Sequence, residues 1–581
     1  MQAPGPQPVL ELDRGDVAEE ERLLGVELRR IEGMRVQRVG DSATLLVQHD
    51  QHDEGDEIEQ KPATAAEDER GGEEDEDVAV GREREPERQH LGEQGDPERD
   101  DREGRRPPVD AGAWRAPAAA VAAAGLLAVA LRAPFFGAPL TADEGGYGEV
   151  ARLWSHGATL YRDAWVDRPQ GLELVFRAVL HVDGGSATAM RALAAVVAAG
   201  VAALTMVVTA RVAGRIAAVG AGLLVATAGA SPFIESFTLS GELLASLLAC
   251  ASMLAFVTHL RGGRREWLVA AGLLTGCAVM LKQSGFDAGA AAAVYLLVTR
   301  RRAGLAPVAV LVGSALVPVA IGAVAATSLS DWWYALVTYR GQADSIVTGS
   351  VSARLDMARD SLPAALKALG PMLVLALPGL RRSPLLGRIW VAVAALCVIG
   401  GGNFHAHYYQ QLVPPLGLMA GVGVAAIWAA RSRAWAAVAG AAAGLALVFT
   451  APLWFDSPAA QARAVFPNDA HLLSDGAVVR YVRSHTEPGQ RIFVLWAAAN
   501  VYYLADRDPA VRYMWYRNIQ AIPGALDEAR AALRSSDPPA LVVVENLPAG
   551  IDRSGETGRI LQDRYRRVAV VSGVPIYAPR H

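Results

Sequence analysis

Stretches of apolar residues recur along most of this chain and set its organisation. Crossing the hydrocarbon core of a bilayer takes about 20 apolar residues, so each long stretch predicts a membrane-spanning helix. The expected spans are 114–134, 190–210, 214–232, 242–260, 266–283, 286–300, 305–328, 364–380, 388–402, 411–430 and 434–454. The pattern predicts a polytopic α-helical membrane protein with about 11 transmembrane helices.

Arginines mark every second connection between these stretches. They are Arg105, Arg106, Arg211, Arg215, Arg261, Arg264, Arg265, Arg300, Arg301, Arg302, Arg381, Arg382, Arg388, Arg431 and Arg433. Basic connections stay on the cytoplasmic side of a membrane. We therefore expect a multi-pass protein of the cell (plasma or inner) membrane with a cytoplasmic N-terminus. The connections 135–189, 233–241, 329–363 and 403–410, a turn near 283–285 and the tail after the last span are then extracytoplasmic.

The first 110 residues differ in composition from everything that follows. They contain 33 acidic and 15 basic residues, a balance of −18, whereas the whole chain has a net charge of −6, so the remainder carries +12. A segment so rich in charge cannot bury enough apolar surface to fold. Residues 1–110 are predicted to be a disordered acidic segment, either a cytoplasmic tail or an extension from a wrongly assigned start. The basic remainder suits anionic lipid surfaces and phosphate-bearing ligands.

The tail, 455–581, alternates helix-like and strand-like stretches. Helices are expected at Gly476–His485 and Ala525–Arg534, and strands at Arg491–Trp496, Leu541–Val544, Val568–Val571 and Pro575–Ala578. This alternation predicts a small α/β domain. It carries no glycine-rich phosphate-binding motif, so its expected role is that of a lid or docking platform over the membrane helices.

The first outer connection, 135–189, carries candidate chemistry. It combines the acidic pair Asp143 and Glu144 with Asp163, Asp167 and Arg168, and a short amphipathic helix is expected at Val150–His156. A carboxylate at the end of a span can serve as a base, and a cation fixed beside a proline can stabilise developing phosphate charge. Charges that only solvate a loop at the membrane surface are the alternative explanation.

The order of these elements resembles that of the GT-C membrane glycosyltransferases. The likeness is to the protein O-mannosyltransferases (glycosyltransferase family 39) and the lipid A aminoarabinose transferases. Those enzymes carry an acidic pair in the first outer loop and, further along it, a basic-Pro-Pro-Gly-like element. Here the pair is Asp143 and Glu144 and the element is D-R-P-Q-G at 167–171, with Arg in place of the usual Lys and Gln in place of the second Pro. Arginine would hold a phosphate in a bidentate geometry.

Three later elements extend the resemblance. Glu242 matches a second outer-face acid of the family, Lys282 with the following Gln matches a K-Q element, and His405, His407, Tyr408 and Gln410 match an H-Y-x-x-Q-L-x-P-P element. Capping of a helix by Glu242 and snorkelling of Lys282 to the headgroups are the structural alternatives. The two histidines lack a third ligand at usable spacing, so we expect them to form hydrogen bonds rather than bind zinc.

The resemblance implies a GT-C-type catalytic module at 111–454 with a small C-terminal extracytoplasmic α/β domain. It implies a hexosyl or pentosyl transferase that moves a sugar from a polyprenyl-phosphate-linked donor, held among membrane lipids, to an extracytoplasmic glycan, lipid or protein. Asp143 is then the expected base, and Glu144 supports it or holds the acceptor. Arg168 and Lys282 would bind the donor phosphate, and Asp163, Asp167, Glu242, His405, His407, Tyr408 and Gln410 would bind substrate. A divalent metal is compatible with this site but required by none of its residues, and no nucleic acid is expected as a partner.

Two other classes of protein remain open. A lipid-linked sugar flippase or transporter would use the same hydrophobic body, but its ionisable groups would lie near the bilayer midplane and its sequence would show a two-fold repeat. Neither feature is apparent here. A non-catalytic membrane assembly protein would tolerate the loss of Asp143.

Overall fold

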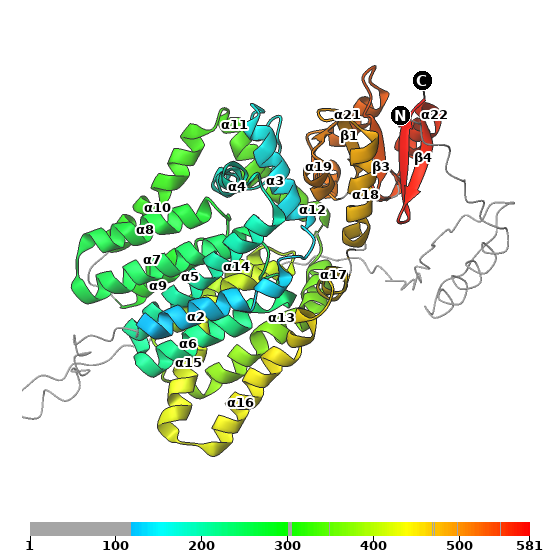
Figure 1. The fold of residues 1–581 in the computed structure, drawn as a ribbon. Coiled ribbons are helices and arrows are strands. Elements are labelled where there is room, and N and C mark those ends of the chain that lie inside the picture. The colour runs from blue at the N-terminus through cyan, green and yellow to red at the C-terminus, as the bar shows by residue number, and fades with distance from the viewer. Residues whose placement is uncertain are drawn as a thin grey trace, which may run out of the picture. The chain divides into compact units, whose positions relative to one another are not determined.

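The chain forms a helical body followed by a small α/β domain, which confirms the predicted fold class (Figure 1). The computed structural model describes residues 118–299, 305–347, 349–467, 469, 471–496, 498–546 and 548–580. The expected acidic segment 1–110 and the arginines at 300–302 lie outside these residues.

Each of the expected spans corresponds to a helix. These helices are α2 (Ala118–Ala130), α5 (Ala187–Ala213), α6 (Arg215–Thr227), α7 (Gly241–Gly262), α8 (Arg265–Val279), α9 (Asp287–Thr299), α10 (Ala306–Ala325), α13 (Val351–Ala376), α14 (Leu385–Gly400), α15 (Val413–Ala430) and α16 (Arg433–Val448). Within the described part of the chain, 7 helical segments have the length and apolar character of a full span. The segments at α6, α9 and α14 are apolar but shorter. The expected number of about 11 thus counts apolar helices, not all of which have the length of a straight crossing.

The first outer connection is largely helical. Helix α3 spans Ala142–Ser155 and α4 spans Gln170–Asp183, and the irregular stretch between them closes through a parallel bridge of Leu160 with Ala164. The expectation of a loop with one short helix at Val150–His156 was therefore wrong for residues 142–149, because the helix begins at a local capping signal before its apolar face is apparent.

Short helical segments lie between the long helices along the chain. They are η2 (Ala133–Phe135), η3 (Ala228–Ala230), η4 (Pro232–Ile234), α11 (Leu329–Trp333), the π-helical η6 (Tyr334–Thr338), α12 (Tyr339–Val347), η7 (Leu377–Gly379), η8 (Ala406–Leu412) and η9 (Ala451–Trp454). Helix α13 begins at Val351, well before the expected 364, because its first turns are charged and give no apolar signal.

The C-terminal domain is built on a five-stranded sheet in the order β2-β1-β3-β5-β4. The strands are β1 (Arg491–Leu495), β2 (Asp508–Pro509), β3 (Leu541–Val544), β4 (Tyr565–Val571) and β5 (Val574–Pro579). Strand β1 runs parallel to β2 and β3, and β5 pairs antiparallel with β3 and β4. The helices are α17 (Pro458–Val465), α18 (His471–His485), α19 (Asn500–Ala505), α20 (Tyr516–Ala521), α21 (Ala525–Arg534) and α22 (Glu556–Arg564), with the turn η10 (Pro548–Gly550). All four predicted strand segments and both predicted helices are present.

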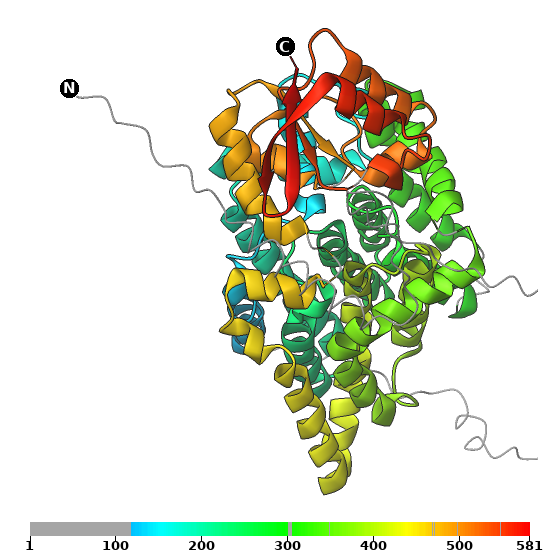
Figure 2. The same ribbon diagram turned by 90° about the vertical axis from the view of Figure 1, so that its right-hand side faces the viewer.

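The domain and the helical body share one core. A continuous cluster of buried apolar side chains runs from the long helices through α3 into β1 and β3. Helix α19 packs on α3, and α20 packs on α12. Figure 2 shows the strands, in orange and red, gathered at one end of the bundle of helices. The domain is therefore seated on the elements that carry the candidate site.

Candidate active site

A capping box fixes the start of helix α3 and, with it, the acidic pair. The Thr141 hydroxyl accepts the backbone N–H of Glu144 at 3.2 Å, and the Glu144 carboxylate accepts the backbone N–H of Thr141 at 3.3 Å. This exchange satisfies two donors that a helix start would otherwise leave unpaired. Asp143 consequently stands in the first helical turn, where the helix dipole favours negative charge.

Glu144 points into the protein and is fully engaged there. Its side chain is buried, forms an ion pair with the buried Arg191 of α5, and accepts the backbone N–H of Leu239 at 2.8 Å. A buried carboxylate paired in this way holds elements together, because loss of either partner would leave an uncompensated charge. Glu144 therefore ties α3 to α5 and to the segment before α7.

Asp143 faces a cavity instead. It is partly buried, and its Oδ1 accepts the indole N–H of Trp515 at 3.1 Å. The cavity holds about 320 Å³ of empty space and is lined by Thr141, Asp143, Glu144, Tyr147, Arg168, Glu235, Thr238, Leu239, Ser240, Gly241, Glu242 and His407. The structure thus brings Asp143, Arg168, Glu242 and His407, which the sequence singled out, to one place.

Arg168 is fixed by the element at 167–171. Its Nη1 lies 3.0 Å from Asp167 Oδ1, and its guanidinium lies 5.7 Å from the centre of the Tyr147 ring. Asp167 in turn pairs with Arg340 of α12 at 2.9 Å, and its carbonyl accepts from Gln283 at 2.7 Å. Asp167 therefore does not line the cavity but holds the buried Arg168 in it.

Glu242 and Lys282 form a buried ion pair on the next side of the cavity. Ser240 caps α7, and Glu242 in its first turn lies 2.6 Å from the ammonium of Lys282. That ammonium also stands 4.4 Å from the centre of the Tyr408 ring. Ser240, and not Glu242, thus supplies the side-chain cap of α7, and Lys282 pairs with an acid.

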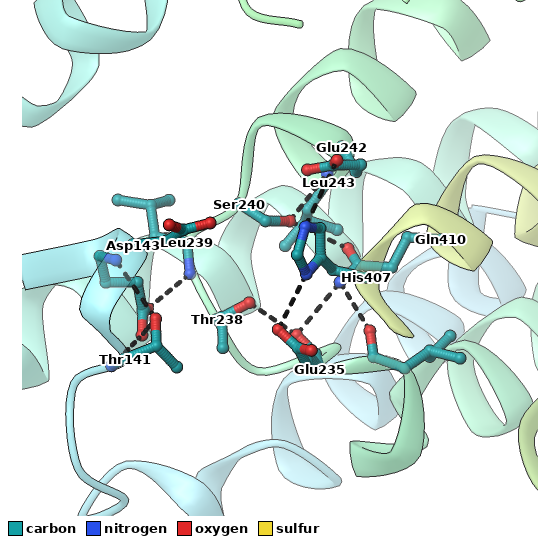
Figure 3. Close-up of polar contacts among 12 residues, drawn as sticks. Thr141, Asp143, Glu235, Thr238, Leu239, Ser240, Glu242, Leu243, His407 and Gln410 are labelled. Atoms are coloured by element: carbon teal, nitrogen blue, oxygen red, sulfur yellow. Dashed lines mark hydrogen bonds and ion pairs between the residues drawn. The ribbon is translucent and has the colours of Figure 1, made fainter. Parts of the chain in front are cut away.

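His407 connects two acids. Its Nδ1 lies 3.0 Å from Glu235 and its Nε2 lies 3.8 Å from Glu242, and Figure 3 shows the ring between the two carboxylates. Glu235 was missed in the sequence. The signal available was a single acid in an otherwise uncharged outer connection, and its partner His407 is 172 residues away.

The backbone at Glu235 has a left-handed conformation, φ 53°, which is uncommon for a residue other than glycine. Two buried side chains hold it. Arg132 donates to the carbonyls of Gly229 and Ser236 at 2.6 and 2.9 Å, and Gln410 donates to the carbonyls of Ile234 and Glu235 at 2.8 and 3.1 Å. Gln410, expected to bind substrate, thus braces the backbone that presents Glu235.

Two of the expected residues lie elsewhere. Asp163 is exposed; it pairs with Arg162 at 3.2 Å and accepts the backbone N–H of Thr159 at 3.0 Å. These donors, Arg162 first, lower the pKa of Asp163 to about 2. His405 is exposed and stacks on His407 with ring centres 5.5 Å apart, but it does not line the cavity. Among the described residues, no group of three or more His, Cys, Asp or Glu side chains is arranged to hold a metal ion.

A second, largely apolar groove begins where the cavity ends. It holds about 1290 Å³ of empty space and is lined by Lys282, Gln283, Ser284, Phe286, Leu336, Val337, Arg340, Asp344, Val393, Leu396, Cys397, Gly400, Gly401 and Tyr408. Its cations are Lys282, which pairs with Glu242 of the cavity, and Arg340, which pairs with Asp167 beside Arg168. The ion pair between Glu242 and Lys282 joins the two spaces, because Glu242 lines the first and Lys282 the second.

Comparison with known proteins gives one family match and several matches in fold. The family model of dolichyl-phosphate-mannose-protein mannosyltransferases matches residues 167–325, a segment that contains Arg168, Glu235, Glu242 and Lys282. No curated protein matches the chain in sequence.

Among solved structures, ArnT from Cupriavidus metallidurans bound to undecaprenyl phosphate is 18% identical, covering 79% of this chain and 97% of that one with a TM-score of 0.55. Its apo form is 17% identical over the same shares, with a TM-score of 0.53. The archaeal oligosaccharyltransferase AglB from Archaeoglobus fulgidus, in complex with an inhibitory peptide and a dolichol-phosphate, is 12% identical over 80% of this chain and 74% of that one. Its TM-score is lower, at 0.45.

The chain resembles the dolichyl-phosphate-mannose-protein mannosyltransferases over residues 167–325, and its fold supports a likeness to the GT-C superfamily. It has the ArnT fold and is a multi-pass membrane protein.

Proposed function

We propose that the protein is a membrane glycosyltransferase that moves a sugar from a polyprenyl-phosphate-linked donor to an extracytoplasmic acceptor. The observation that carries this proposal is the junction of two spaces. A polar cavity with a carboxylate and a guanidinium meets a long apolar groove headed by cations. A donor with a lipid tail, a phosphate and a sugar carries apolar, charged and polar groups in the same order as these two spaces.

We place the donor by matching its apolar, charged and polar parts to those of the two spaces. The polyprenyl tail lies along the apolar groove, where Leu336, Val393 and Leu396 offer hydrocarbon contacts. The phosphate lies near Lys282 and Arg340, the cations that line the groove. Arg168 faces it from the neighbouring cavity, beyond the ion pair of Lys282 with Glu242. Supporting this placement, the ArnT structure with the same fold was solved with undecaprenyl phosphate bound.

The chemistry follows from the positions of Asp143 and the cations. The Asp143 carboxylate takes the proton of an acceptor hydroxyl, and the acceptor oxygen bonds to the anomeric carbon of the sugar. The bond between that carbon and the phosphate oxygen breaks, and its electron pair leaves with the polyprenyl phosphate. Arg168 and Lys282 stabilise the negative charge that grows on the leaving phosphate. Glu144 supports the reaction by holding α3 in place.

Asp143→Asn tests the base, and Asp163→Asn is its matched control, since Asp163 is an acid of the same connection that does not line the cavity. Membranes containing each variant at equal level receive a polyprenyl-phosphate hexose or pentose with a labelled sugar. We expect Asp143→Asn to lower the transfer of label by about 10²–10⁴-fold and Asp163→Asn to leave it unchanged. Normal transfer by Asp143→Asn would remove the base from the mechanism, and label that crosses liposome membranes without transfer would favour a flippase.

The proposal places the cavity on the extracytoplasmic side, as the arginine pattern predicts. Reporter fusions at Arg301 and Pro488 are expected to give opposite signals, cytoplasmic for the first and extracytoplasmic for the second. Equal signals would overturn the orientation and with it the side from which the acceptor approaches.

A further inference from the structure

Three glycines near the start of α3 create a close seat for the C-terminal domain. Glycine inside a helix costs about 0.5–1 kcal/mol relative to alanine, so three in two turns call for a packing reason. A Cβ at Gly146 would lie 2.8 Å from Cη2 of Trp515, and one at Gly148 would lie 2.8 Å from Cε2 of Tyr503. The third, Gly145, meets the backbone of Asn500 in the same way. Each glycine thus admits a residue of the C-terminal domain.

Polar contacts fix the domain on this seat. The Asn500 amide donates to the carbonyl of Leu140 at 3.1 Å, and Arg152 of α3 pairs with Asp508 of β2 at 2.7 Å. Beyond α3, Asn518 of α20 donates to the hydroxyl of the buried Tyr339 of α12 at 2.7 Å. With apolar contacts between them, these bonds hold the segment before α20 in one position over α3.

That segment presents Trp515 to the candidate base. The indole N–H donates to Asp143 Oδ1 at 3.1 Å, and the indole ring lies 5.8 Å from the Tyr147 ring, centre to centre. A carboxylate held through one oxygen by a fixed donor presents its other oxygen in a defined direction. A base that takes a proton from a bound acceptor needs such an orientation. Trp515 lines neither the cavity nor the donor groove, so it acts through Asp143.

We propose that the C-terminal domain completes the active site by supplying Trp515 as a positioning residue for the Asp143 carboxylate. The inference rests on the proposed function, in which Asp143 is the base. It gives the domain a part in turnover beyond that of a cover or docking platform, and it explains the glycines of α3 as the means of bringing an indole within reach of Asp143.

Trp515→Phe and Trp515→His in the full-length protein separate positioning from packing. Phenylalanine keeps an aromatic ring against Tyr147 but has no N–H, whereas histidine retains a ring N–H donor. We expect Trp515→Phe to lower kcat about 10–10²-fold with an unchanged KM for the polyprenyl-phosphate sugar, because it removes a hydrogen bond to a charged group. Trp515→His should recover part of the loss. Wild-type kcat in Trp515→Phe, or a KM effect alone, would overturn the inference.

A double variant distinguishes failure of this inference from failure of the proposed function. Because Trp515 acts through Asp143, Trp515→Phe should have no further effect in the Asp143→Asn background. If Asp143→Asn retains normal transfer, the proposed base fails. If Asp143→Asn loses transfer but Trp515→Phe lowers kcat equally in both backgrounds, only the role of Trp515 fails.

Gly146→Ala tests the same contact between α3 and Trp515 by changing α3. Its Cβ would displace the indole, so we expect a kcat loss like that of Trp515→Phe, although alanine favours the helix itself. Gly313→Ala in α10 is the matched control, because a Cβ there meets nothing within 4 Å. We expect that control to keep full kcat. Full kcat in Gly146→Ala would show that the close approach is not needed for turnover.

Discussion

The cavity beneath α3 and the C-terminal ends of β1 and β3 both bury carboxyl groups but surround them differently. In the cavity, Glu242 faces Lys282 at 2.6 Å. At the sheet, Asp475 of α18 accepts only from the neutral amide of Asn500, at 2.7 Å, and its other oxygen has no hydrogen-bond partner among the described residues. Among the described residues, buried acids therefore differ in their surroundings: some are given donors or cations, and others, such as Asp475 and Glu173, are left largely without them.

The charge state follows from these surroundings. Burial raises the pKa of Asp475 to about 7; the Asn500 hydrogen bond and His471 oppose the rise, and Glu545 and Asp469 add to it. Asp552, in the same domain, also has little exposed surface, but hydrogen bonds from Ser554, Thr557 and Arg530 hold its pKa well below the usual range. Donors therefore contribute to whether an acid with little exposed surface is ionised.

Removing the cation from the cavity pair should have the largest effect. Lys282→Met removes the nearest cation from the buried Glu242 and leaves only His407, 3.8 Å away, and loss of a buried ion-pair partner costs about 3–5 kcal/mol. We expect a large fall in the unfolding temperature of the full-length protein in detergent, together with loss of sugar transfer. The double variant Lys282→Met/Glu242→Gln removes the uncompensated charge and should recover stability without recovering transfer. A single variant as stable as the wild type would show that the pair does not support the fold.

Asp475→Asn should give a pH-dependent gain in stability. Since the folded pKa, about 7, exceeds the ordinary 3.8, the folded protein keeps a proton that the unfolded chain releases, and stability falls as pH rises from 4 to 7. The difference corresponds to about 4 kcal/mol at most. The variant should match the wild type near pH 4 and be more stable at pH 8. His471, whose pKa the Glu545 hydrogen bond raises, leaves a residual slope of the same sign. Equal stability at pH 8 would mean that the fold does not raise the pKa of Asp475.

Asp552→Asn should do the opposite in the same domain. The Asp552 carboxylate accepts the N–H of Thr557 at 2.7 Å and pairs with Arg530 at 2.7 Å. An amide cannot accept all these bonds, so we expect a loss of about 1–3 kcal/mol at pH 7. The lowered pKa makes this contribution present above pH 4 and lost as pH falls further. Thermal unfolding of the two variants at pH 8 should therefore shift in opposite directions.

Local patterns in the sequence predicted much of this fold. Strand β3 and helix α21 have the predicted bounds, because a short β-branched run and an amphipathic stretch can each be recognised within ten residues. The start of α3 was missed although Thr141 and Glu144 have the spacing of a capping box, because the helix begins before its apolar face is apparent.

The site was predictable only in part. Asp143, Arg168, Glu242, Lys282 and His407 carried motif signals, and the structure brings them together. Glu235 depends on a backbone conformation held by distant side chains, and Trp515 reaches Asp143 across 372 residues. No pattern along the chain encodes such contacts, because they join residues that are far apart in the sequence.

The smallest effect is expected for an acid that has donors but lies in solvent. Arg162 and Thr159 lower the pKa of Asp163 to about 2, so its charge adds stability above pH 4 that is lost as pH falls towards 2. Water and salt screen this exposed pair, however, and such pairs contribute little. We expect Asp163→Asn to unfold within error of the wild type at pH 7, with only a slightly shallower fall in stability below pH 4. If it destabilised the protein as much as Asp552→Asn, the number of donors alone would set the value of an acid here, and burial would not matter.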